Sequence, residues 1–150
     1  MHDLEEGLAE VIEVVWEKML GLQSERTGPP VGSASGSRLI ARVQWKGVGG
    51  ALAIECPDAL LREAAAALFS LEADAATEED LQDTIGELIN VIAGNARGLF
   101  ENDPGFSLPD VDRSDAVPDW QGNKSGEVWF ISDGSPFRVF AASACADEAS

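Results

Sequence analysis

An acid and an amide stand three residues apart, at Glu87 and Asn90, in a stretch whose apolar residues recur at helical spacing. At 100° per residue, Asp83 and Gly94 fall on the same face as this pair, opposite the apolar positions. Side chains at this spacing rise from adjacent turns and can address one small target together. The carboxylate can pair with a cation, and the amide both donates and accepts hydrogen bonds. The pattern predicts a helix with chemistry on its outer face, although it is equally that of a simply solvated face.

Glycines at positions 86, 94 and 98 each cost about 1 kcal/mol relative to alanine inside a helix. Without side chains, residues 94 and 98 leave a shallow trough along the outer face, into which the backbone of another protein can approach closely. We therefore expect Asp83 and Gly94 to contact a protein partner beside the Glu87 and Asn90 pair.

The helix that carries these residues is predicted over about 78–100. Thr77 and Asp80 form a capping-box-like start, since the threonine oxygen can accept from a free backbone N–H and early acids favour the helix dipole. The Asn-Asp-Pro-Gly run at 102–105 ends the helix. The residues expected to bury against a sheet are Leu81, Ile85, Leu88, Ile89, Ile92, Ala96 and Leu99.

The remaining elements predict helices packed on a mainly antiparallel sheet, an α+β fold. We expect a first helix over 3–22, a hairpin with strands over 39–46 and 51–56, and a helix from 58. A short strand over 106–111 precedes two closing strands, over 128–131 and 137–141, around a turn at 133–136. The Gly-, Pro- and Ser-rich segment 23–37 is a flexible connector within a single domain, 1–150.

The formal net charge of −17, from 27 acidic and 10 basic residues, repels phosphate backbones and anionic lipids. We expect neither nucleic acid nor membrane as a partner, and favour a protein with a basic or metal-bearing surface. No positively charged segment precedes an apolar run at the N-terminus, and the two cysteines form no disulfide framework. A cytoplasmic protein is expected.

Other candidate residues offer less chemistry. His2 is the only histidine and lies at the terminus, which leaves no base for a Ser-His-Asp triad and no histidine-based metal site. Cys56 is expected to be a small buried hydrophobe, and Cys145 lies in the C-terminal tail. Trp45 is expected in a core or dimer interface, whereas Trp120, in a polar loop, suits either local packing or a partner contact.

The run Asp83-x-x-x-Glu87-x-x-Asn90, within Gly-Glu-Leu-Ile-Asn-Val-Ile-Ala-Gly-Asn, resembles the signature helix of the CheC/CheX/FliY group of chemotaxis phosphatases. A single copy resembles CheX. The resemblance implies a CheX-like α/β sandwich whose substrate is a phosphorylated CheY-type response regulator. Glu87 would then pair with a lysine of the regulator, and Asn90 would enter its phosphorylation pocket and orient water.

The resemblance also implies that the metal ion, Mg²⁺, belongs to the regulator, so that this chain needs no cofactor or metal of its own. The family habit is a homodimer whose sheet continues across the subunits. Two hypotheses follow: an aspartyl-phosphate phosphatase acting on the regulator, or a non-catalytic adaptor of the same fold that binds a regulator or another signalling protein. The sequence does not identify the regulator, nor whether its pathway controls flagella or pili.

Overall fold

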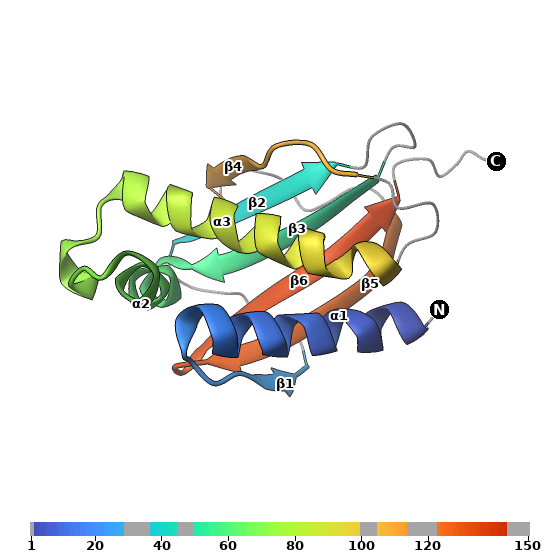
Figure 1. Cartoon of the computed structure of the whole chain (residues 1–150), viewed down its shortest axis with the longest axis horizontal. Coiled ribbons are helices and arrows are strands. Elements are labelled where there is room, and N and C mark those ends of the chain that lie inside the picture. Colours follow the sequence, from blue (N-terminus) through green and yellow to red (C-terminus); the bar gives the residue numbers. More distant parts are fainter. Residues whose placement is uncertain (1, 29–36, 45–49, 100–104, 114–122, 144–150) are drawn as a thin grey trace.

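One antiparallel sheet carries the helices on one of its faces in the computed structural model of the chain (Figure 1). The structure describes residues 2–28, 37–44, 50–99, 105–113 and 123–143. The strand order is β1-β5-β6-β3-β2-β4, and every neighbouring pair is antiparallel. The predicted α+β class is therefore confirmed. In chain order the described elements are α1 (His2–Val15), the π-helical turn η1 (Trp16–Leu20), β1 (Glu25–Thr27), β2 (Arg38–Gln44), β3 (Gly50–Pro57), α2 (Asp58–Phe69), a 3₁₀ turn (Ala73–Ala75), α3 (Glu78–Ala96), a second 3₁₀ turn (Arg97–Leu99), β4 (Asp110–Arg113), β5 (Asn123–Ser132) and β6 (Ser135–Ser143).

The central hairpin follows from the alternation along the sequence. Leu39 pairs with Cys56 and Val43 pairs with Leu52 across β2 and β3. These residues are fully buried beneath the helices, because alternate side chains of a strand point to one face. The closing hairpin joins β5 to β6 through Asp133 and Gly134, both with positive φ, as the turn signal predicted.

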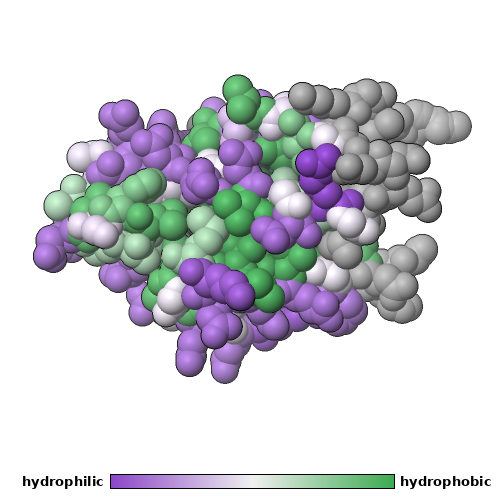
Figure 2. Space-filling model, in the orientation of Figure 1, coloured by the Kyte–Doolittle hydropathy of each residue, from purple (hydrophilic) through white to green (hydrophobic). Residues whose placement is uncertain are grey.

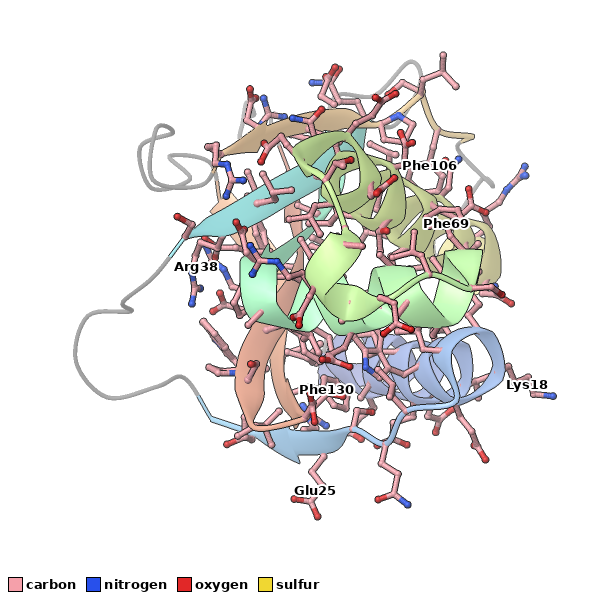
Figure 3. The ribbon with its side chains drawn as sticks, turned by 90° about the vertical axis from the view of Figure 1, so that its left-hand side faces the viewer. Lys18, Glu25, Arg38, Phe69, Phe106 and Phe130 are labelled. Atoms are coloured by element: carbon pink, nitrogen blue, oxygen red, sulfur yellow. The ribbon has the colours of Figure 1, made fainter. Side chains whose placement is uncertain are left out.

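The main core lies between the sheet and the helices α1 and α3. Phe130 projects from the sheet toward the helices (Figure 3) and is fully buried. Trp16 is also fully buried, with its ring 4.2 Å from that of Phe137, and its Nε1–H donates to the hydroxyl of Ser132 at 3.0 Å. This tryptophan ties η1 to the closing hairpin.

The opposite face of the sheet holds a second, charged layer. Glu55 is only 6% exposed and accepts a hydrogen bond from Nε of Arg138 at 2.7 Å. Arg38 lies 3.9 Å from the same carboxylate, and Arg138 also donates to Glu127 at 2.6 Å. The guanidinium of Arg138 stands 4.6 Å from the ring centre of Phe140. These contacts link four strands across the helix-free face.

Three sequence-based boundaries need correction. The predicted connector over 23–37 contains β1, whose residues pair with β5 at the sheet edge. The short strand predicted over 106–111 is β4 and begins only at Asp110, since Pro109 has no N–H to donate to a ladder. The α-helix predicted over about 78–100 begins where expected but ends at Ala96, and a 3₁₀ turn follows.

Other predicted boundaries differ in length. The closing strands are longer than the expected 128–131 and 137–141, and the last turn of the first helix is π-helical. Trp45, Trp120, Cys145 and most of the glycine turn after Trp45 lie outside the described residues, as do residues 29–36 of the connector.

Candidate functional site

The helix α3 separates a buried stripe from an exposed polar face, as predicted. Its buried residues pack against the sheet. Asp83, Glu87, Asn90 and Gly94 are all exposed and share the opposite face. The structure thus brings the four predicted site residues together on one surface, spread over about 16 Å of helix axis at 1.5 Å per residue. The predicted stripe members that are buried are Leu81, Ile85, Leu88, Ile89, Ile92 and Ala96, while the side chain of Leu99 lies outside the described part of the chain.

A capping box fixes the beginning of α3. The hydroxyl of Thr77 accepts from the backbone N–H of Asp80 at 3.1 Å, and the Asp80 carboxylate accepts from the Thr77 N–H at 2.9 Å. Two otherwise unsatisfied backbone donors are paired in this way, which stabilises a helix start by about 1 kcal/mol. The local sequence signal was therefore sufficient to place the first residue of the helix.

Arg113 on β4 holds the same end of α3 to its surroundings. Its guanidinium donates to both oxygens of Asp58, at 2.8 Å each, and to the carboxylate of Glu78. Asp58 opens α2 and Glu78 opens α3, so one arginine joins a strand to two helix starts. The hydrogen bond from Arg113 lowers the pKa of Glu78 below its usual value. Sequence reasoning missed this positioning residue, because it placed Arg113 in a loop.

The two flanks of α3 have different neighbours. On one flank, a Cβ added to Gly86 would lie 3.9 Å from a methyl of Val111 and 4.0 Å from Cβ of Pro109. The segment leading into β4 therefore packs close to the helix at this glycine. On the other flank lies α1, beside α3 on the same face of the sheet (Figure 1). The site face is the strip between these two supports.

Glu87 and Asn90 are free to meet a partner. Within the described part of the chain, neither side chain makes a hydrogen bond or an ion pair. At a spacing of three residues, their Cβ atoms lie about 5–6 Å apart. A carboxylate and an amide at this separation can hold one cation and one water molecule on adjoining positions of a bound surface. The pair stands on an exposed helix face and lines no pocket among the described residues.

The glycines near the end of α3 lie in open space. A Cβ added to Gly94 or Gly98 would meet nothing within 4 Å, and both residues are exposed. Neither glycine is needed for close packing inside the described part of the protein. Both positions are therefore open to the approach of another molecule, and nothing in the described part of the chain packs at Gly94 to offset its cost in helix stability.

The described residues contain no competing chemical site. Cys56 is fully buried, and its burial raises the pKa of the thiol, which disfavours a reactive thiolate. No three of the described His, Cys, Asp and Glu residues are grouped to hold a metal ion. No described helix is long and apolar enough to cross a bilayer.

The fold and the site define a class of protein: helices on one face of an antiparallel sheet, with an acid and an amide displayed on a helix for a partner. The family model described as "Chemotaxis phosphatase CheX" matches residues 39–129, more than half of the chain. The chain belongs to this CheX family, as the resemblance of the Asp83 to Asn90 run indicated. No curated protein sequence matches it significantly.

Solved structures share the fold over nearly the whole chain. The chemotaxis protein CheX from Vibrio vulnificus superposes with a TM-score of 0.72 at 14% identity, covering 93% of this chain and 95% of that one. CheX from Desulfovibrio desulfuricans gives 0.67 at 15% identity, covering 94% and 99%. A structure described as the CheX-CheY-BeF3-Mg+2 complex from Borrelia burgdorferi gives 0.65 at 19% identity, covering 91% and 95%. At these identities the likeness establishes the fold.

Proposed function

We propose that this chain is a phosphatase that accelerates the hydrolysis of the aspartyl phosphate of a CheY-type response regulator in the cytoplasm. The observation that carries the proposal is the exposed pair of Glu87 and Asn90 on one face of α3, which has no hydrogen-bond or ion-pair partner among the described residues. Membership of the CheX family supports the reaction class. A CheX relative described in complex with CheY, BeF3 and Mg²⁺ supports the class of partner.

Asn90 would supply the orientation that the reaction needs. Hydrolysis of an acyl phosphate requires a water molecule in line with the breaking P–O bond, and correct positioning accounts for much of the achievable rate enhancement. An amide suits this task because it hydrogen-bonds to water without taking up charge. Asn90 stands on a capped helix, and no partner among the described residues has to be released first. The Mg²⁺ that neutralises phosphoryl oxygens would be held by the regulator, and this chain would contribute no cofactor.

Glu87 would anchor the partner rather than the water. A lysine of the regulator, paired with this carboxylate, would set the distance between the two proteins and the depth to which Asn90 enters the phosphorylation pocket. Asp83 lies about one turn before Glu87, and Gly94 about one turn after Asn90, on the same face. Asp83 would add negative charge at one end of the contact, and Gly94 would let the regulator approach the helix backbone at the other.

The test is phosphate release from phosphorylated CheY-type regulators of the same genome. Wild-type protein should accelerate release from at least one regulator. Glu87→Ala should raise KM about ten-fold or more, since it leaves a lysine of the partner unpaired at the interface. Asn90→Ala should lower kcat by about 100-fold, the loss typical of removing one well-placed polar group. A regulator that binds without any acceleration of its hydrolysis would favour the adaptor hypothesis.

We also propose a homodimer. Both edge strands of the described sheet are short: β1 has three residues and β4 has four. β1 pairs only with residues 129–131 of the ten-residue β5, so the described chain leaves the rest of that outer edge without a strand. A second copy could extend the sheet there. Light scattering at micromolar concentration should give twice the monomer mass of 15.9 kDa, and a mass of one chain would refute the dimer.

A further inference from the structure

A groove runs between α1 and α3 on the outer side of the helical layer. Gly7, Glu10, Val11 and Val14 of α1 line it, together with Asn95 of α3, and its volume is about 280 Å³. Val14 is 49% exposed, so part of its apolar side chain faces the groove uncovered by the described part of the chain. Figure 2 shows apolar surface where the two helices lie side by side, with hydrophilic surface around it. The groove is thus a hollow lined by two valines and by the polar side chains of Glu10 and Asn95.

The groove lies beside the face that carries Glu87 and Asn90, on the flank of α3 toward α1. Asn95 follows Asn90 by five residues, which is about 7–8 Å along the helix axis. Its side-chain amide donates to the backbone carbonyl of Val91 at 2.8 Å, which holds the amide against its own helix. At 100° per residue, Val91 and Asn95 lie about 40° and 80° around the helix from Glu87, on the flank toward α1, whereas Asn90 lies about 60° to the other side of Glu87.

The area of a typical protein interface favours a partner that covers both the Glu87 and Asn90 face and the groove. A specific protein interface buries about 800 Å² on each side, far more than two side chains and two glycines expose. A partner that places its phosphorylated residue at Asn90 must therefore also cover a neighbouring element. The flank at Gly86 is filled by Pro109 and Val111. The flank toward α1 is hollow, and so offers the cavity into which a side chain of the partner can insert.

The charges around the groove indicate which kind of partner surface would bind there. Glu10 lines the groove itself. Lys18 is the single basic residue of the segment 2–20, and it lies at the far end of that segment from Gly7. A partner surface with lysine or arginine around an apolar residue would complement this arrangement, with burial at the centre and ion pairs at the rim. Among the described residues, the exposed acids of α1, η1 and α3 are Glu6, Glu10, Glu13, Glu17, Glu78, Glu79, Asp83 and Glu87.

We infer that the α1–α3 groove is the second half of the regulator-docking surface and receives an apolar side chain of the CheY-type regulator flanked by basic residues. The inference rests on the proposed function and adds to it the residues that determine affinity, Val14 and Glu10. The chemistry at Asn90 and the affinity supplied by the groove are then separable. Changes in the groove alter KM, and changes at Asn90 alter kcat.

The test uses the full chain with substitutions on the exposed surface, which leave the core intact. Val14→Arg places a bulky cation in the groove, and Glu10→Lys reverses the charge at its rim. The matched controls are Ile131→Arg, on the helix-free face of the sheet and 37% exposed, and Glu25→Lys, on the edge strand β1 (Figure 3). Each protein is assayed for phosphate release and for binding to beryllofluoride-activated regulators of the same genome.

We expect Val14→Arg and Glu10→Lys to raise KM and Kd about ten-fold, with kcat at saturation within two-fold of wild type, and the controls to match wild type. Unchanged KM and Kd in Val14→Arg, beside an active wild type, would refute the role of the groove in docking and leave the proposed function intact. A loss of dimer mass with unchanged KM would assign the groove to a second copy instead. A wild type that neither binds nor dephosphorylates any regulator would refute the proposed function, and the groove's occupant with it.

Discussion

Replacing Gly94 with alanine separates what α3 needs for its own stability from what it needs for docking. Glycine in a helix interior is less stable than alanine by about 0.5–1 kcal/mol. The new methyl would meet nothing within 4 Å, so no steric cost opposes the gain. For a domain of this size, each kcal/mol moves the unfolding midpoint by about 2–4 °C. Gly94→Ala should therefore raise Tm by about 1–4 °C.

The same methyl should weaken the contact with the regulator. If the partner approaches the helix backbone at Gly94, an added methyl overpacks the interface, and a loss of about 1.4 kcal/mol corresponds to a ten-fold higher KM. Gly86→Ala is the matched control, because its methyl would make ordinary contacts with Val111 at 3.9 Å and Pro109 at 4.0 Å. That variant should gain similar stability with no change in KM.

Calorimetry and phosphate release on the three proteins test both halves of the reasoning. A lower Tm for Gly94→Ala would mean that the space around residue 94 is not open. A higher Tm with an unchanged KM would mean that the regulator does not approach the helix at this point. Either result would remove Gly94 from the docking surface.

Two further changes test the supports of the fold. Glu55→Ala should lower the free energy of unfolding by about 3–5 kcal/mol, because it leaves Arg138 and Arg38 buried without their shared carboxylate; a urea-derived loss below about 1 kcal/mol would contradict this. Arg113→Met should destabilise the fold above about pH 4.5, the usual pKa of glutamate. The destabilisation should become smaller as pH falls, because Arg113 lowers the pKa of Glu78, and protonation of that carboxylate removes the stabilisation that the pair contributes. Unfolding curves from pH 3 to 7 measure the difference, and a constant gap across that range would exclude the pair as its source.

The elements that could be predicted from sequence are those specified by local signals. Thr77 and Asp80 mark the start of α3 through their own side chains, and the apolar period that follows fixes which face is buried. The site face followed directly, since the exposed side of a helix is the complement of its buried stripe. The central hairpin was recovered for the same reason, from the alternation between Leu39 and Val43.

The elements that were missed depend on contacts between distant residues. All three residues of β1 are exposed, so the sequence has no apolar alternation that would indicate a strand. The strand forms because its residues pair with β5. Arg113 finds its partners 55 and 35 residues away, and sequence spacing carries no information about either contact. Trp16 follows Ile12 by four residues and so lies on the buried side of the first helix, but its hydrogen bond to Ser132 joins residues 116 positions apart, which sequence spacing does not indicate.

The most direct test of the proposed chemistry compares turnover and binding in Asn90→Ala. Asn90 is exposed and has no partner among the described residues, so its removal should leave the fold intact. We expect binding of the beryllofluoride-activated regulator to stay within about three-fold of wild type while phosphate release falls by about 100-fold. Undiminished phosphate release, or a loss of release fully explained by lost binding, would contradict a catalytic role for Asn90.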